Sequence, residues 1–233
     1  LKQWLLRWRA ATRTETGLED MRHPIEGSVL AGISRIFRSR YLLGISLLVV
    51  LLATLNTFLY MEQARLVADT FTDTAQRIRV FSALDFTVQA LALLSQLFIT
   101  GRVAARLGLR FLLTAVPLAV GLSFLALAAF PVFGVLAAAM ILRRAGEYAL
   151  IRPGREMLFT AVPPEDKYKT KSVIDTVVYR GGDAASGWVK AGVDMLGYGA
   201  ALIALLGAAV ALGAAAVGYG LGKRADARKP DHS

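Results

Sequence analysis

The sequence lacks cysteine and contains only two histidines, His23 and His232, in polar segments near opposite ends of the chain. Without cysteine there is no disulfide framework and no thiolate metal site. The wide separation of the two imidazoles also argues against a histidine metal site. Neither a Ser/His/Asp set nor a Walker-type phosphate loop is present. We therefore expect no enzyme activity and no resident metal or cofactor.

Charge is also scarce. Only 19% of the 233 residues are charged, whereas soluble domains carry about a quarter. Hydrophobic residues make up 55% of the chain, and the mean hydropathy is +0.51. The composition therefore indicates a protein embedded in a bilayer, with membrane lipid and not nucleic acid as its surroundings.

Apolar segments of membrane-spanning length recur along the chain. A spanning helix needs about 20 mainly apolar residues, and Pro131 separates two such segments because proline ends a helix. We predict an all-α membrane protein, a bundle of six transmembrane helices. The predicted spans are residues 41–61, 82–100, 111–130, 132–151, 173–196 and 197–221. In the last span, Gly218-x-x-x-Gly222 would allow close contact with another helix.

Lysine and arginine are concentrated in alternate connecting segments, which predicts the orientation of the bundle. The positive-inside rule places the more basic segments in the cytoplasm. An even number of spans then leaves both termini cytoplasmic. The more basic segments hold eight (residues 1–40), three (101–110), five (152–172) and four (223–233) of these residues, whereas the opposite side holds three (62–81) and Lys190.

The chain is expected to have three parts: a basic amphipathic linker (residues 1–40), the bundle (41–222) and a cytoplasmic tail (223–233). In the linker, Trp4, Trp8, Ile33 and Phe37 recur at helical spacing among arginines. Such a helix lies on an anionic membrane surface or packs against neighbouring protein. Both alternatives remain open.

Charged residues interrupt the fourth and fifth spans. An ionised side chain at the centre of a spanning helix costs about 2.5–3.5 kcal/mol on insertion scales, so such groups pair or face water or protein. Arg143 and Glu147 are four positions apart and Arg144 and Glu147 three, so either arginine can meet the carboxylate on one helix face. These groups predict either a polar pathway or simple cross-links between helices.

A longer polar stripe is expected along the fifth span. At 100° per residue, its polar side chains fall within about 40° of one line. The stripe comprises Thr176, Arg180, Asp183, Gly187, Lys190 and Asp194. We expect Lys190 and Asp194, near the outer interface, to be solvated. Arg152 and Arg155 belong to the cytoplasmic loop 152–172 and are expected only to cross-link helices or to reach the surface.

The loop after the second span, GRVAARLGLR (residues 101–110), resembles the loop motif Gly-x-x-x-Asp-Arg-x-Gly-Arg-Arg of major facilitator transporters. Gly101, Arg106, Gly108 and Arg110 match, and Ala105 replaces the aspartate. In that family the motif follows the second helix of each half. The resemblance therefore implies the second half of a twelve-helix transporter, preceded by an N-terminal six-helix half of the same protein.

A second stretch, KYKTKSVIDTVVYRGGDAASGW (residues 167–188), resembles the C-terminal half of the ATP/ADP exchange transporters of plastids and intracellular bacteria. The matching residues are Lys167, Lys169, Lys171, Ile174, Asp175, Val177, Val178, Arg180 and Gly182. The resemblance implies nucleotide exchange by alternating access in a bacterial inner membrane. Asp183-Ala184 stands where the exchangers carry Lys-Ser, which replaces a cation by an anion and favours a different cargo.

The resulting expectation is a transporter for a small anionic solute, with nucleotide exchange as one version; the alternative is a membrane scaffold or sensor that keeps the transporter fold. An arginine would attract the solute, and Glu147 or Asp183 could instead carry a coupled proton. The candidate pathway residues are Arg144, Glu147, Arg180, Asp183, Asp85, Gln89, Asp175 and Tyr179.

Overall fold

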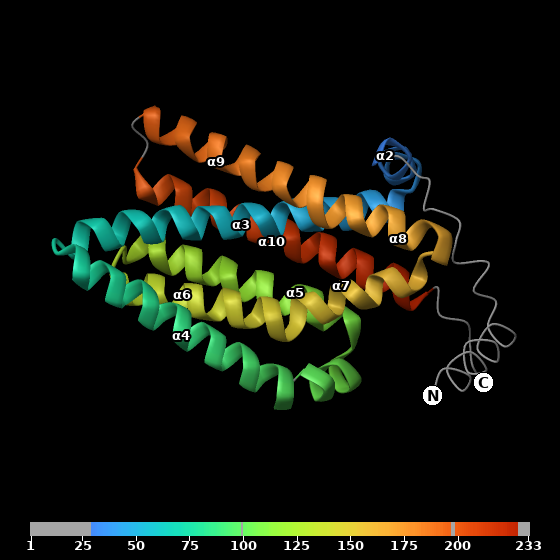
Figure 1. Ribbon diagram of the computed structural model, residues 1–233, viewed down its shortest axis with the longest axis horizontal. Helices are drawn as coiled ribbons and strands as arrows, with labels where there is room; N and C mark the ends of the chain where they lie inside the picture. Colours follow the sequence, from blue (N-terminus) through green and yellow to red (C-terminus); the bar gives the residue numbers. More distant parts are fainter. Residues whose placement is uncertain (1–28, 99, 197–198, 228–233) are drawn as a thin grey trace, which may run out of the picture.

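The computed structural model describes residues 29–98, 100–196 and 199–227, which form an elongated bundle of helices without a strand among them (Figure 1). The predicted linker before residue 29 and the tail after residue 227 lie outside the described residues. The α-helices are α2 (Val29–Arg38), α3 (Arg40–Thr70), α4 (Thr74–Phe98), α5 (Thr100–Ala129), α6 (Phe133–Gly146), α7 (Arg152–Leu158), α8 (Pro164–Val173), α9 (Tyr179–Met195) and α10 (Ala200–Asp226).

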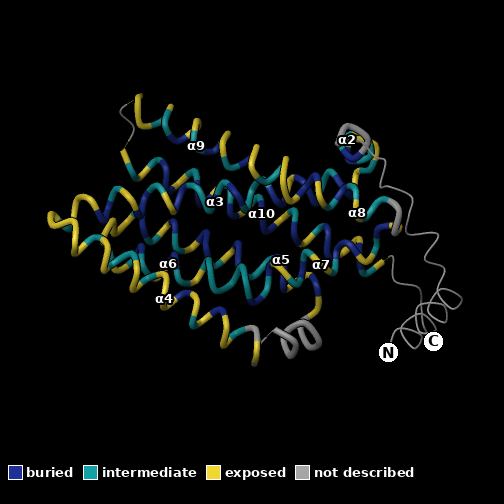
Figure 2. The backbone as a smooth tube through the Cα atoms, viewed as in Figure 1, coloured by how far each residue is buried: buried dark blue, intermediate teal, exposed yellow. Residues whose placement is uncertain are grey.

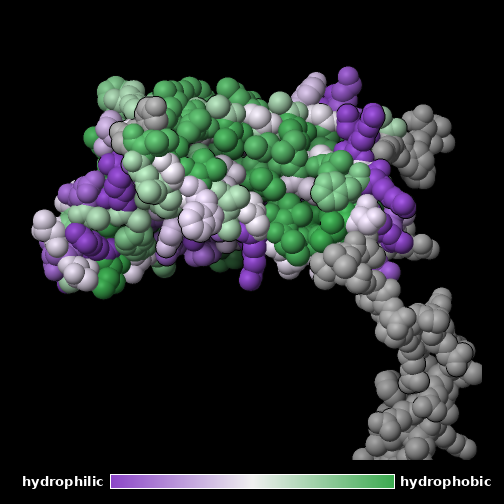
Figure 3. Space-filling model, turned by 90° about the horizontal axis from the view of Figure 1, so that it is seen from above, coloured by the Kyte–Doolittle hydropathy of each residue, from purple (hydrophilic) through white to green (hydrophobic). Residues whose placement is uncertain are grey.

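Four of these helices are long and apolar enough to cross a membrane: α3, the Thr74–Ser95 part of α4, α5 from Gly108 onward, and α10. They coincide with the first, second, third and sixth predicted spans. On the face seen in Figure 3, hydrophobic side chains cover much of the surface between the two ends of the bundle, and most of the hydrophilic ones gather toward the ends. The chain thus has the architecture of an all-α, multi-pass membrane protein.

The other two predicted spans are divided by π-helical turns. Helix α6 continues into the π turn η2 (Glu147–Ile151) and then into α7, and α8 reaches α9 through the π turn η4 (Ile174–Val178). A π turn inserts one residue into a helix and rotates everything beyond it. The straight pieces α6 and α9 have only 14 and 17 residues and carry charge. The count of six membrane-spanning helices therefore stays a prediction.

The closest helix packing joins α5 to α10. A Cβ atom added to Gly218 would lie 2.6 Å from the carbonyl oxygen of Leu113, and one added to Gly222 would lie 2.9 Å from the Cα atom of Arg110. Only glycine permits backbones to approach this closely, which is a common basis of helix association in lipid. The expected contact through Gly218-x-x-x-Gly222 is therefore present. Gly108 adopts φ +72° between the first turns of α5 and its long apolar part, a conformation that favours glycine.

Helix α9 packs along α3 at the edge of the bundle. The backbones approach where a Cβ atom on Gly182 would lie 3.3 Å from the Cα atom of Val50. The hydroxyl groups of Ser186 and Thr54 are 2.8 Å apart. The outward side of α9 is exposed, as Figure 2 shows by its yellow segments. Buried residues concentrate instead on α3 and α10 near the middle of the bundle.

Candidate functional site

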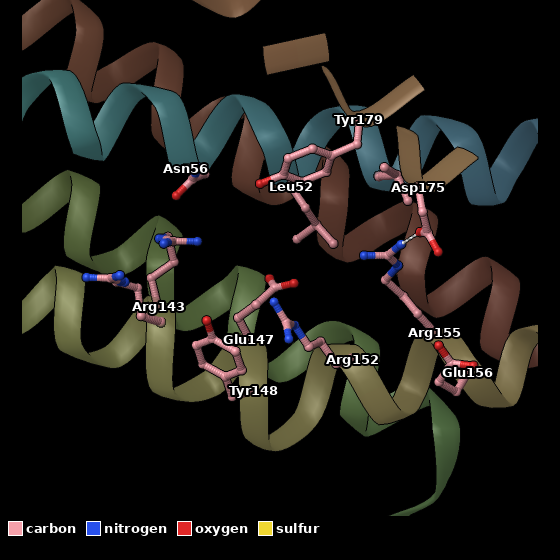
Figure 4. Close-up of a pocket in the computed structure, with 12 residues that line it drawn as sticks. Leu52, Asn56, Arg143, Glu147, Tyr148, Arg152, Arg155, Glu156, Asp175 and Tyr179 are labelled. Atoms are coloured by element: carbon pink, nitrogen blue, oxygen red, sulfur yellow. Dashed lines mark hydrogen bonds and ion pairs between the residues drawn. The ribbon is translucent and has the colours of Figure 1, made fainter. Parts of the chain in front are cut away.

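A cleft of about 520 Å³ lies between α3, the α6–η2–α7 rod and the region of η4 (Figure 4). Its floor and walls are mostly polar, although the helices around it are apolar. The lining residues are Val49, Leu52, Asn56, Arg143, Arg144, Glu147, Tyr148, Arg152, Arg155, Glu156, Asp175 and Tyr179. Seven of these twelve side chains are arginines or carboxylic acids, so the cleft is strongly charged.

The α6–η2–α7 rod supplies one complete wall because its polar residues recur once per helical turn. Arg144, Tyr148, Arg152 and Arg155 are separated by four, four and three positions, and all four line the same cleft although the π turn η2 lies between them. Both π turns border the cleft: η2 begins at Glu147, and η4 contains Asp175. Such turns are rare and are frequently found at functional sites.

Ion pairs fix several of the charged side chains by joining neighbouring helices. Arg144 pairs with Asp85 of α4, and Arg155 pairs with Asp175 of η4. At the end of the cleft, Glu156 accepts a hydrogen bond from Lys171 of α8 at 2.6 Å. Within each pair the opposite charges offset each other. Because the partners belong to different helices, the pairs also hold the walls of the cleft together.

Other charges in the cleft remain available. Arg143 and Glu147 form no hydrogen bond and no ion pair with any described residue, although they are one turn apart, and the Nε atom of Arg143 is buried without a partner. The guanidinium of Arg152 lies over the ring of Tyr148, with Cζ 4.2 Å from the ring centroid. This stacking uses the flat face of the guanidinium and leaves the N–H groups at its edge able to donate hydrogen bonds. In Figure 4 these side chains extend toward the space below Asn56 and Leu52.

The structure brings together half of the predicted pathway residues. Arg144, Glu147, Asp175 and Tyr179 line the cleft. Asp85 does not line it but holds Arg144 from α4.

The other three predicted pathway residues lie apart from the cleft. Gln89 is exposed on α4, one turn beyond Asp85, and Arg180 is exposed on α9. Asp183 accepts a hydrogen bond from the hydroxyl of Thr57, on the α3–α9 contact. The structure therefore separates these residues from the cleft-lining set.

The residues of the predicted stripe of the fifth span differ in how far they are buried. Asp183 and Lys190 face the packed side, while Thr176, Arg180 and Asp194 are exposed. All of them except Thr176 lie in the regular helix α9, after the π turn of η4, so that turn can displace only Thr176 from the others. Lys190 is only 5% exposed and pairs with Asp194 at 2.6 Å, so the expectation that Lys190 is solvated was wrong.

Three arginines of the cleft were missed or misplaced by the sequence reasoning. Arg143 was not among the pathway candidates, and Arg152 and Arg155 were expected only to cross-link helices or to reach the surface from a cytoplasmic loop. Arg155 does link two helical segments, through its ion pair with Asp175, but it also lines the cleft and is only 16% exposed. The helical spacing that connects Arg144 to Arg155 was the signal available, because it continues past the predicted end of the fourth span.

Comparison of the chain with protein-family models, with curated proteins and with solved structures finds no match. What the site can do therefore follows from its chemistry. Guanidinium groups without carboxylate partners bind anions, most strongly where water is partly excluded. A cleft with four arginines, three carboxylates and two tyrosines suits a polar, anionic ligand of small size.

Proposed function

We propose that this chain is part of a membrane transporter that carries a small anionic solute through the arginine-lined cleft. One observation carries the proposal: the Nε atoms of two arginines that line the cleft, Arg143 and Arg155, are buried without a hydrogen-bond partner among the described residues, inside a bundle with membrane-length helices. An unpaired charge at such depth is costly and characteristic of substrate or ion pathways. An anionic solute would supply the missing acceptor.

In this mechanism the free guanidinium groups hold the solute, and the paired ones shape its site. Arg143 and Arg152 would donate hydrogen bonds to the anion, with Asn56 and Tyr179 available for its uncharged polar groups. Glu147 has no ion-pair partner among the described residues, so it can take up a coupled proton or bind a cationic group of the solute. Asp183 does not line the cleft, and its carboxylate accepts a hydrogen bond from Thr57.

The cleft is bounded on only part of its circumference, so a transport cycle requires further protein to cover it. The resemblance to major facilitator and ATP/ADP exchange transporters suggests an N-terminal six-helix half of the same protein for this role. Two such halves would rock about a site near the middle of the bilayer. The same resemblance suggests a bacterial inner membrane and makes a nucleotide one candidate cargo. The distribution of lysine and arginine suggests that both termini are cytoplasmic.

Uptake into proteoliposomes tests the proposal. The full-length protein would be reconstituted and supplied with labelled ATP, ADP, inorganic phosphate and a dicarboxylate, with and without a pH gradient. We expect saturable uptake of at least one anion above that of protein-free vesicles. Nucleotide exchange without a gradient would support the exchanger version. Proton-dependent uptake of another anion would remove the nucleotide version, and absence of flux for every anion would contradict the function.

A membrane scaffold or sensor is the second candidate, and the cross-links between helices favour it. Arg144–Asp85 and Arg155–Asp175 are arrangements that a purely structural role would also produce. In that case, substitutions in the cleft would change thermal stability or partner binding without any effect on solute flux.

A further inference from the structure

Helix α2 lies across one end of the bundle. In Figure 1 it is seen end-on, while α3, α5 and α10 run lengthwise, so its axis is nearly perpendicular to theirs. It docks onto α8, where a Cβ atom on Gly32 would lie only 2.7 Å from a methyl group of Val173. An amphipathic helix perpendicular to membrane-spanning helices lies in the plane of the interface between lipid and water.

A second cavity, of about 260 Å³, opens beside this helix where α2, α3 and the start of α8 meet. One side of it is basic and polar, and the other side is apolar. The polar side includes Arg35, Arg38 and Ser39, and the apolar side includes Leu42, Ala161 and Val162. A cavity divided in this way suits an amphiphile with a charged head, not a fully polar ion.

The charges of this cavity leave one cation available. Asp166, which also lines it, forms an ion pair with Arg35. Arg38 is exposed and has no hydrogen bond or ion pair with the described residues. The guanidinium of Arg38 can therefore pair with a singly charged phosphodiester. Next to Arg38, the side chain of Phe37 is 71% exposed. An exposed aromatic side chain is favourable in the interfacial region of a bilayer.

We propose that this cavity binds the headgroup of an anionic phospholipid, with Arg38 donating to the phosphate and Phe37 lying among the adjacent acyl chains. The lipid would fix α2 to the membrane surface. The site lies on a different part of the chain from the arginine-lined cleft and does not depend on transport activity.

Native mass spectrometry of the purified, delipidated protein tests this site. The protein in detergent would be titrated with dioleoyl-phosphatidylglycerol and, separately, with dioleoyl-phosphatidylcholine. We expect one phosphatidylglycerol molecule to bind more tightly than the others, and Arg38→Gln to weaken this binding about fivefold to tenfold. Arg79→Gln, which removes an exposed arginine from α4, is the matched control and should leave binding unchanged.

Three results would overturn the proposal. Equal retention of phosphatidylcholine would show that the headgroup charge is not recognised. Unchanged retention by Arg38→Gln, with normal helical content and elution, would place the lipid elsewhere. Displacement of the lipid by inorganic phosphate at equal concentration would identify a free-phosphate site. Arg38→Lys, which keeps the charge, should restore part of the affinity and separates charge recognition from a packing defect.

Discussion

Replacing Gly218 by leucine is expected to destabilise the bundle more than any other single change to its helix contacts. The added Cβ atom alone would approach the Leu113 carbonyl oxygen to 2.6 Å, and a backbone atom cannot rotate away as a side chain can. Overpacking of well-packed sites costs about 1–3 kcal/mol, and more where backbones must separate. We expect the thermal unfolding midpoint in detergent to fall by about 6–12 °C.

Gly220→Leu is the matched control. It lies on the same helix, two positions away, and a Cβ atom there meets nothing within 4 Å. Both substitutions replace a glycine of α10 by leucine, which has the higher helix propensity. This stabilising contribution is the same in both variants, so it cancels when their unfolding midpoints are compared. Equal midpoints for the two variants would contradict the close α5–α10 contact.

Arg143→Gln is expected to reduce uptake of the transported anion about tenfold to a hundredfold at solute concentrations below saturation. Arg143 lines the cleft, and no hydrogen bond or ion pair holds its guanidinium among the described residues, so we expect it to bind the solute. A hydrogen bond to a charged group contributes about 1.5–3 kcal/mol, which corresponds to that loss of affinity. Arg143→Lys should retain part of the uptake because it keeps the charge but loses the planar fork of donors.

Substitutions of two other arginines test whether the loss of uptake is specific to Arg143. Arg144→Gln should reduce uptake less than Arg143→Gln, because Arg144 is already neutralised by Asp85. Arg224→Gln, exposed in the last turn of α10, should have no effect on flux. If Arg143→Gln transports as well as Arg224→Gln, Arg143 does not bind the solute.

The long apolar helices could be predicted because length and composition alone determine whether a helix can cross a bilayer. The prediction of a break at Pro131 is also confirmed, since α5 ends at Ala129 and α6 begins at Phe133. The fourth and fifth predicted spans were harder, because each contains a π turn. No residue type marks such a turn, and one extra residue changes the face on which every later side chain lies.

The cleft could be predicted only in part for a related reason. Spacing placed Arg143, Arg144 and Glu147 near one another but could not say which arginine was free. That depends on Asp85, which approaches from a different helix. Likewise, Asp183 and Asp175 lie on the same predicted span, yet one meets Thr57 of α3 and the other Arg155 of α7. Such partners follow from packing and not from local sequence.

The most direct test of a water-filled pathway is the reactivity of single cysteines in a membrane. The chain has no native cysteine, so Asn56→Cys in the cleft and Leu122→Cys on the outer face of α5 can each be labelled selectively. Leu122 is 68% exposed and lies within an apolar spanning segment, where lipid would surround it. With a water-soluble, negatively charged methanethiosulfonate, we predict that the Asn56 variant reacts in membranes and the Leu122 variant reacts only after denaturation. An Asn56 variant as unreactive as the Leu122 variant would contradict an aqueous cleft between these helices.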